Sequence, residues 1–292
     1  MAMPPFAIVR VNPPGFGHAG IFSEVTETLH HGLTELGCDS VLVENTVFEG
    51  RINVIFSGHM LHHIGNFTWP THTVLFNLEP LRAEIFARVP HYSHLLCDRR
   101  VSMVWDYDRK NLPVLETLGV QRSQVIPIGY APAMTRIPAA PQRDIDVLFY
   151  GSLTERRKAL QQQLESRGLS TTFAFGVYGA ARDALIARAK VVLNLSQFEH
   201  GGIFDIVRLS YLLSNRACIV AESGFDAEQE SEFSEGVAFA PYEDLAAECA
   251  YFCKVEAERE GLTQRGFAFF TRRRQSEYLR TPVRALAQLL RL

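Results

Sequence analysis

The stretch Asp146–Leu160, DVLFYGSLTERRKAL, predicts a buried strand, a turn at Gly151 and the start of a helix. Three cations, Arg156, Arg157 and Lys158, stand in the first turn of this helix. A helix N-terminus already carries a partial positive charge, so cations there cost stability unless an anion offsets them. A strand, a glycine turn and a helix N-terminus together form a common phosphate-binding arrangement. We therefore expect an anion at this turn, and one or two of the cations can reach it because a helix rotates by about 100° per residue.

Strands alternate with helices on both sides of this stretch. Such a pattern predicts α/β architecture with parallel sheets covered on both faces. In the first half, strands are expected at Phe6–Val11, Ser40–Glu44, Asn53–Phe56, Thr73–Asn77, His94–Cys97, Ser102–Trp105 and Gln124–Ile128. In the second half, they are expected at Asp146–Tyr150, Thr172–Phe175, Val191–Leu195, Cys218–Val220 and Val237–Phe239, followed by a helical tail from Tyr242.

A proline-rich connector, PAMTRIPAAP from Pro132 to Pro141, separates the two halves. The chain of 292 residues is also longer than one typical core requires. We therefore expect two Rossmann-like, doubly wound domains, residues 1–133 and 143–292, joined by a linker at 134–142 and facing a cleft. Ligands of such sheets bind at the carboxyl ends of the strands.

Composition excludes several function classes. The net charge of −3 and the pI near 6.4 argue against nonspecific binding of nucleic acid. Five scattered cysteines indicate free thiols in a reducing compartment, and no apolar run of about 18 residues predicts a transmembrane segment. The N-terminus lacks the layout of a signal peptide, so a cytoplasmic location is expected. No metal is expected, because no further potential ligands stand at metal-site spacing from His59, His62 and His63 or from Cys249 and Cys253.

Polar residues follow the strands of the first half. The loop Asn12–Gly20, NPPGFGHAG, lets the backbone approach a ligand at Gly17 and offers His18 as a general base. The alternative is a loop histidine bonded to backbone. Asn77 and Glu79 follow one strand in FNLEPL, and Asp106 follows another in WDYDRKN. Turn and cap chemistry is the alternative for both groups.

The segment Asn194–Arg208, NLSQFEHGGIFDIVR, joins a strand to a helix in the second half. Glu199 lies in the loop, and the pair Gly201 and Gly202 precedes the helix. Asp205 can bind paired hydroxyls and Arg208 a phosphate. The alternative is an Asp205–Arg208 pair within the helix, which stabilises by only about 0.2–0.5 kcal/mol.

Three segments, DVLFYGSLTERRKAL, VYGAARDALIARAKVVLNLS and FDIVRLSYLLSNRACIVAE, resemble the nucleotide-sugar-binding C-terminal domain of GT-B glycosyltransferases of the glycosyl transferase group 1 type. The resemblance implies a hexosyltransferase-type enzyme that uses a nucleoside diphosphate sugar as donor without a metal or other cofactor, and an acceptor bound by the first domain. It implies catalytic roles for His18, Glu199 and Asp106 and acceptor contacts from Gly17, Asn77 and Glu79. The implied donor contacts are Gly151, Ser152, Arg156, Lys158, Tyr178, Gly201, Gly202, Ile203, Phe204, Asp205 and Arg208.

The sequence departs from this family at several points. Tyr211 stands where the family often has a glutamate that binds the ribose, so either Asp205 substitutes for it or ribose recognition is lost. The E-x7-E pair is absent, which leaves the stereochemistry of transfer open. The chain is short for two full GT-B domains, so the first domain is expected to be trimmed. A non-catalytic nucleotide- or glycan-binding scaffold remains the alternative, while a dinucleotide-dependent oxidoreductase is disfavoured because GxGxxG is absent.

Overall fold

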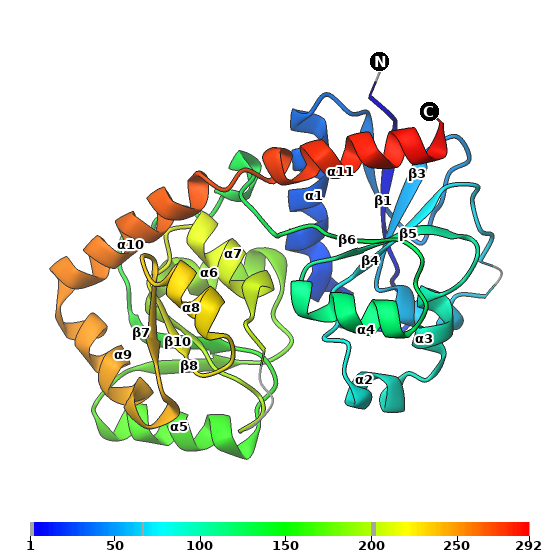
Figure 1. Ribbon diagram of the computed structural model, residues 1–292. Coiled ribbons are helices and arrows are strands. Elements are labelled where there is room, and N and C mark those ends of the chain that lie inside the picture. Colours follow the sequence, from blue (N-terminus) through cyan, green and yellow to red (C-terminus); the bar gives the residue numbers. More distant parts are fainter. Residues whose placement is uncertain (1–2, 66, 200–202, 292) are drawn as a thin grey trace. The chain divides into compact units, whose positions relative to one another are not determined.

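The chain forms two compact α/β units in a computed structural model that describes residues 3–65, 67–199 and 203–291 (Figure 1). Unit 1 comprises residues 1–131 and 274–292, and unit 2 comprises residues 132–273. Both ends of the chain therefore belong to unit 1. Each unit is built around its own parallel sheet, as the alternating pattern predicts.

Unit 1 contains a six-stranded sheet in the order β2-β1-β3-β4-β5-β6, and every pair of neighbouring strands is parallel. The order reverses between β1 and β3, so the switch point of this sheet lies there. Loops that follow these two strands are the expected place for a ligand. The strands are β1 Phe6–Arg10, β2 Ser40–Glu44, β3 Ile52–Phe56, β4 Thr73–Asn77, β5 Val101–Asp106 and β6 Ser123–Val125.

Helices connect the strands of unit 1 and cover its sheet. Helix α1 packs against β1 and β2 through Val25, Leu29 and Leu33, whose spacing places them on one helical face. The helices are α1 Ser23–Glu35, α2 Ala83–Arg88, α3 His91–Leu96, α4 Leu112–Thr117 and α11 Gln275–Leu290, and the 3-10 helices are η1 Ala19–Phe22, η2 Gly58–His63 and η3 Arg109–Asn111.

The last helix, α11, belongs to unit 1, which differs from the expected second domain of residues 143–292. It packs against α1, which it crosses in Figure 1, and a Cβ at Gly32 of α1 would be only 2.7 Å from the Gln275 side chain. Gln275 also accepts a hydrogen bond from the Gly129 N–H (2.7 Å). The apolar spacing in the tail predicts a helix correctly, but it carries no information about which sheet the helix covers.

Unit 2 contains a five-stranded parallel sheet in the order β11-β10-β9-β7-β8. Its order reverses between β7 and β9, so this second switch point lies beside the turn that follows β7. The strands are β7 Ile145–Tyr150, β8 Thr171–Ala174, β9 Ala189–Asn194, β10 Ile219–Glu222 and β11 Val237–Ala240.

Both faces of the unit 2 sheet are buried. Val147 and Val191 pack with α5 and α9 in one apolar cluster, while the alternate residues Leu148 and Val192 are buried as well. Such burial on both faces explains why these strands are almost wholly apolar. The helices are α5 Glu155–Ser166, α6 Gly179–Arg188, α7 Ile206–Ser214, α8 Ala227–Phe233, α9 Leu245–Lys254 and α10 Glu256–Thr271, with η4 Pro132–Met134 and η5 Tyr242–Asp244 as 3-10 helices.

One predicted strand is wrong. Residues 94–97 were expected to be extended, but they lie at the end of helix α3. The buried side chains of α3 are Tyr92 and Leu96, one helical turn apart, and a short run of three apolar residues cannot distinguish a strand from a buried helix.

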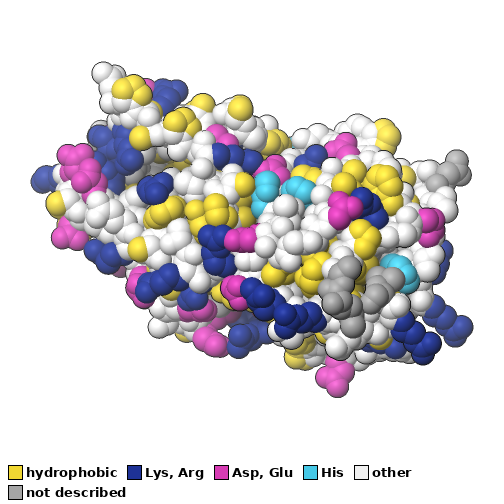
Figure 2. Space-filling model, turned by 90° about the horizontal axis from the view of Figure 1, so that it is seen from above, with side chains coloured by type: hydrophobic (Ala, Val, Ile, Leu, Met, Phe, Trp, Pro, Cys, Tyr) yellow, Lys and Arg dark blue, Asp and Glu magenta, His cyan; other side chains and the backbone are white. Residues whose placement is uncertain are grey.

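Acidic and basic side chains are interspersed on the surface seen in Figure 2. All five cysteines are free thiols, and Cys38, Cys218 and Cys249 are buried. Among the described residues, no helix combines the length and the apolar character that crossing a membrane requires.

Candidate functional site

The turn after β7 lies at the switch point of the unit 2 sheet. Gly151 has a φ of +149°, and its N–H donates to the carbonyl of Ala174 at 2.9 Å. A Cβ at this position would lie 3.1 Å from the Phe149 ring and 3.5 Å from a terminal nitrogen of Arg208. The absence of a side chain thus leaves the backbone of the turn open toward the Arg208 guanidinium.

Arg156, in the first turn of α5, is paired within unit 2. Its guanidinium donates to both carboxylate oxygens of Glu222 at the end of β10, with Nη1 at 2.9 Å from Oε2. It also lies 3.9 Å from the centre of the Tyr242 ring. The pair is largely buried, with Arg156 17% and Glu222 6% exposed. Glu222 thus supplies an internal negative partner for one of the three cations at this helix end.

The other two cations have different surroundings. Arg157 is buried and donates to the carbonyls of Ser152 (2.8 Å) and Leu195 (2.6 Å), so it ties the turn after β7 to the end of β9. Burial, and secondarily the neighbouring Arg208, lowers the pKa of Arg157 to about 10. Lys158 is half exposed and pairs with Glu155 at 2.8 Å on the outer surface of α5.

Arg208, which belongs to α7, also lies next to the Gly151 turn. Its guanidinium lies 4.9 Å from the centre of the Tyr150 ring, and its polar contacts to Asp205 and Asn194 are both 3.4 Å long. These contacts are longer than charge-assisted hydrogen bonds usually are. Arg208 is therefore the cation best placed to exchange its present contacts for an anion at this turn.

The other predicted donor residues differ from one another in burial and in local contacts. Asp205 caps helix α7 by accepting from the Arg208 N–H at 3.2 Å, which is the local role given as the alternative in the sequence analysis. Phe204 is buried against Phe233 and Phe239, whereas Ile203 is partly exposed. Ser152 and Glu199 are exposed, Tyr178 precedes α6 and is half-buried, and Gly201 and Gly202 lie outside the described residues.

Tyr211 is part of a polar cluster on α6 and α7. Its hydroxyl donates to Asp183 at 2.8 Å and accepts from the Arg136 Nε at 3.0 Å. Arg182 donates twice to the other oxygen of Asp183 and lies 4.5 Å from the centre of the Tyr211 ring. Burial, and secondarily the bond to Asp183, raises the pKa of Tyr211. A carboxylate from α6 therefore lies beside Tyr211, the position at which the sequence resemblance leads us to expect a glutamate.

A second polar cluster lies at the carboxyl ends of β4 and β5 in unit 1. Asp106 is fully buried and accepts from the side-chain amides of Asn77 (2.8 Å) and Asn111 (3.0 Å) and from the Asp108 N–H (2.8 Å). The Tyr92 hydroxyl donates to the side-chain amide oxygen (Oδ1) of Asn77 at 2.7 Å. Burial raises the pKa of Asp106 to about 6, although its hydrogen bonds oppose this shift.

Glu79 and His59 face one another beside this cluster. The Nδ1 atom of His59 lies 3.8 Å from Oε1 of Glu79, and the exposed Arg88 lies 3.7 Å from Oε2. Burial raises the pKa of Glu79 and lowers that of His59 to about 4, so the imidazole is neutral near pH 7. Glu79 was expected to contact a ligand, but its proximity to His59 could not be expected from the sequence, because the two residues lie in different loops.

The loop after β1 places the remaining unit 1 candidates. His18 precedes η1 and packs edge-on against the Phe16 ring at 5.9 Å between centroids. Gly17 is exposed, and no atom lies within 4 Å of a Cβ built there. Both residues follow β1, at the switch point of the unit 1 sheet.

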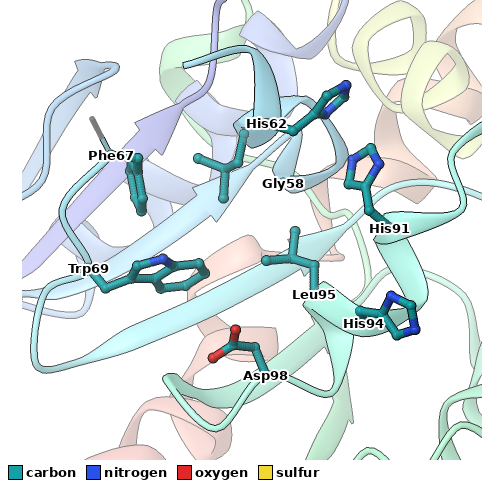
Figure 3. Close-up of a pocket in the computed structure, with 9 residues that line it drawn as sticks. Gly58, His62, Phe67, Trp69, His91, His94, Leu95 and Asp98 are labelled. Carbon is teal, nitrogen blue, oxygen red and sulfur yellow. The ribbon is translucent and has the colours of Figure 1, made fainter. Parts of the chain in front are cut away.

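A cavity of about 300 Å³ lies in unit 1 between η2 with its following loop and helix α3 (Figure 3). Trp69 and Phe67 from the loop and Leu95 and His91 from α3 point into it. The backbone carbonyl oxygen of His59 lies 3.0 Å from ring nitrogens of both His62 and His91. These contacts connect the histidine side of the cavity to the pair formed by His59 and Glu79. No group of three or more potential metal ligands occurs among the described residues.

No protein-family model and no curated protein matches the sequence. The β-glucosyltransferase of T4 phage is similar in structure, with a TM-score of 0.61, 11% identity, and coverage of 99% of this chain and 100% of that chain. AviGT4, a glycosyltransferase involved in avilamycin A biosynthesis, has a TM-score of 0.58 at 16% identity, with 98% of each chain covered.

TarM of S. aureus has a TM-score of 0.55 at 9% identity, with 92% of this chain covered. The chain spans 58% of the length of TarM. Identities this low bear on the fold alone. In each of the two parallel sheets, the third strand along the chain pairs with the first strand on the side away from the second. This strand order and the structural similarities show that the chain has the GT-B fold.

Proposed function

We propose that this chain is a glycosyltransferase that moves a sugar from a nucleoside diphosphate sugar to an acceptor. The observation that carries the proposal is the Arg208 guanidinium beside the open Gly151 turn, at the switch point of a GT-B nucleotide domain. The T4 phage enzyme was crystallised with its substrate UDP-glucose. Uridine diphosphate is therefore the first nucleotide to test.

In the proposed donor site, the diphosphate lies against the Gly151 turn and Arg208. A planar guanidinium can bind phosphate oxygens with paired hydrogen bonds and stabilises the charge that develops on the leaving group. Ser152, Tyr178 and Asp205 are the further proposed donor contacts, and the predicted Gly201 and Gly202 lie outside the described residues. Because Arg208 supplies the positive charge, the proposed transfer requires no metal.

Arg156 and Lys158 have lesser parts in this proposal than the sequence alone indicated. Arg156 holds Glu222 and thereby fixes the loop after β9, since Glu222 also accepts from the Ser196 N–H at 3.0 Å. Lys158 faces outward with Glu155. Arg156 therefore positions the site, while Arg208 contacts the donor.

On the acceptor side, the proposed contacts are the loop residues Gly17 and His18 and the side chain of Glu79. Asp106 was expected to be catalytic, but it is fully buried. We assign it instead to holding Asn77 and Asn111, which in turn fix the Glu79 loop. Glu199 is exposed in the loop after β9 and remains a candidate for a donor-side catalytic role.

A non-catalytic nucleotide-binding protein is the second candidate. It is favoured by Tyr211, whose hydroxyl is already engaged by Asp183 and Arg136 where the family often has a ribose-binding glutamate. Donor hydrolysis without an acceptor separates the two functions, because a transferase can pass the sugar to water and a binding protein cannot.

The test is calorimetric titration of the protein with UDP, GDP and ADP, each with and without EDTA. Binding of one nucleotide at micromolar to millimolar concentration, unaffected by EDTA, is expected. The corresponding nucleotide sugars are then incubated with the protein, and release of the nucleoside diphosphate is measured. Failure of all three nucleotides to bind at millimolar concentration would exclude the proposed donor site.

A further inference from the structure

The cavity of unit 1 reaches away from the edge where a ligand of this sheet is expected. It extends from η2, which follows β3, to Trp69 and Asp98, which precede β4 and β5. Ligands of parallel sheets bind beyond the carboxyl ends of the strands instead. All residues that line the cavity belong to unit 1, and its volume of about 300 Å³ suits a small molecule. A ligand in this cavity occupies a site separate from the proposed donor site of unit 2.

One wall of the cavity is apolar and held in place by its neighbours. The Phe67 ring packs edge-on against Trp69, with 5.3 Å between centroids and 89° between planes, and the Arg100 guanidinium lies 4.4 Å from the centre of the indole. These contacts fix the plane of the Trp69 ring. Leu95 points into the same space from α3 (Figure 3). Because Phe67, Trp69 and Leu95 are only partly buried, they offer an apolar surface to a ring-shaped ligand.

The histidine side of the cavity presents hydrogen-bond acceptors. The backbone carbonyl of His59 is in contact with Nδ1 of His62 and with Nε2 of His91. A carbonyl oxygen can only accept, so these two ring nitrogens carry protons. In the neutral rings the other nitrogens, Nε2 of His62 and Nδ1 of His91, are therefore acceptors. Burial, followed by the neighbouring His91 and His63, lowers the pKa of His62, so this ring is mainly neutral near pH 7.

Asp98 adds an acceptor on the opposite side of Leu95 from His62 (Figure 3). Its Oδ1 accepts from the backbone N–H and the Nε of Arg100, both at 2.9 Å, and its Oδ2 accepts from Nη2 at 2.6 Å. A carboxylate has about four acceptor positions, so these bonds leave one on Oδ2 for a ligand. Hydrogen bonds from Arg100 lower the pKa of Asp98, which keeps the carboxylate ionised beside the guanidinium. The pair thus offers an acceptor without net charge.

An apolar wall between two groups of acceptors fits a ring with an apolar face and hydroxyl groups at its edge. We propose that this cavity is a binding site for a neutral saccharide. The C–H face of a pyranose ring packs against Trp69 and Phe67. Its hydroxyl groups donate to His62 and His91 at one end and to Asp98 at the other. A carboxylate or phosphate ligand is disfavoured, because acceptors cannot donate to it. The inference goes beyond the proposed function and does not depend on it.

The experiment titrates the intact chain, without nucleotide, with the methyl glycosides of glucose, galactose, mannose and N-acetylglucosamine in both anomeric forms. The chain has two tryptophans, and Trp105 is fully buried in the sheet. The fluorescence of Trp69 therefore reports on the cavity, and calorimetry gives the Kd. His62→Phe keeps a flat ring and removes its acceptor. His63→Phe is the matched control, since His63 is the adjacent exposed histidine and is not a lining residue.

We expect at least one glycoside to bind with a Kd of about 1–10 mM and to change the fluorescence of Trp69. His62→Phe is expected to raise this Kd by about 5- to 20-fold through the loss of one hydrogen bond, while His63→Phe leaves it within twofold. Leu95→Phe places a larger side chain in the cavity and is expected to abolish binding. Thermal unfolding midpoints show whether each variant is folded.

Three results overturn the inference: no glycoside binds at tens of millimolar, glycosides bind equally well to the unmodified chain and to the folded His62→Phe and Leu95→Phe variants, or phenol or catechol binds while no glycoside does. The last result would assign the cavity to aromatic ligands. Titration of the same protein with nucleotides tests unit 2 separately, so a failure of the saccharide site and a failure of the proposed donor site are distinguished.

Discussion

The guanidinium of Arg156 holds both carboxylate oxygens of Glu222, a residue 66 positions further along the chain. The pair is largely buried and joins the start of α5 to the end of β10. Removing one member of a buried ion pair leaves the other charge without compensation, which costs about 3–5 kcal/mol. We therefore expect Arg156→Met and Glu222→Met each to lower the free energy of unfolding by that order, measured by chemical denaturation without nucleotide.

The double variant Arg156→Met with Glu222→Met removes both charges together. It is expected to be clearly more stable than the sum of the two single changes implies, because no buried charge remains unpaired. Additive losses in this cycle would show that the two side chains do not act as a pair.

Arg208 is predicted to carry most of the affinity for a nucleoside diphosphate. Arg208→Ala removes one or two charge-assisted hydrogen bonds to phosphate, so the Kd for the bound nucleotide is expected to rise by about 10- to 100-fold. Arg265→Ala, an exposed arginine of the same unit in α10, is the matched control and is expected to leave the Kd within twofold. Equal Kd values for these two variants would show that Arg208 does not contact the diphosphate.

Gly151→Ala is predicted to disturb the donor site through steric contacts of the new Cβ as well as through backbone strain. Alanine is strained at a φ of +149°, at a cost of about 1–3 kcal/mol, and its Cβ would meet the Phe149 ring at 3.1 Å and Arg208 at 3.5 Å. Gly168→Ala, at a φ of +79° with nothing within 4 Å, carries the strain alone. We expect both variants to lose stability in denaturation, but only Gly151→Ala to lose nucleotide affinity in calorimetry. Unchanged affinity in Gly151→Ala would place the diphosphate elsewhere.

The architecture could be predicted from the sequence because its signals are local. Apolar runs such as Thr73–Asn77, bounded by glycine, proline and polar residues, mark strands that are buried on both faces, and their alternation with helices implies parallel sheets. The position of α11 could not be predicted in this way. Its apolar stripe fits any apolar surface of matching shape, and only the folded chain shows that the surface belongs to α1.

The loops of the candidate site could be predicted from the sequence, but the partner of each side chain in them could not. Cations after Gly151 indicated a negative partner, but the sequence did not show that Glu222 supplies one for Arg156. Asp106 ends one strand and Glu79 follows another, yet Asp106 is fully buried and hydrogen-bonded while the carboxylate of Glu79 has only the longer contacts to His59 and Arg88. Such differences depend on contacts between distant segments, which residue spacing does not encode.

His59 is predicted to make unit 1 sensitive to acid. Burial holds its pKa at about 4 in the folded chain, below the ordinary value of 6.5, so the folded state binds fewer protons than the unfolded state between these values. Stability from this group is present above pH 6.5 and is lost as the pH falls toward 4. The difference corresponds to roughly 3 kcal/mol for a shift of this size.

The comparison of the unmodified chain with His59→Gln isolates this effect. Glu79 and Asp106, whose raised pKa values act in the opposite direction, are present in both proteins. The free energy of unfolding of the unmodified chain is expected to decrease more than that of the variant between pH 7 and pH 4.5. Parallel pH profiles from chemical denaturation would show that His59 is not buried in its neutral form.

Tyr211→Glu, which introduces the glutamate that the sequence resemblance leads us to expect at this position, is predicted to reduce both stability and nucleotide affinity. The tyrosine hydroxyl donates to Asp183 at 2.8 Å, and Tyr211 is buried, so a glutamate there would place two carboxylates side by side away from solvent. Like charges at this separation repel one another, and one of them must take up a proton. Tyr211→Phe removes only the hydroxyl and is expected to cost about 1–2 kcal/mol of unfolding free energy.

The double variant Tyr211→Glu with Asp183→Asn removes the repulsion and tests where the ribose is recognised. If the carboxylate of Asp183 replaces that of the family glutamate, the double variant regains nucleotide affinity relative to Tyr211→Glu alone, because one carboxylate is again present in this cluster. Calorimetry with the bound nucleotide and with its 2′-deoxy form measures this directly. A double variant that folds but binds no better than Tyr211→Glu would exclude a role for this carboxylate in binding the ribose.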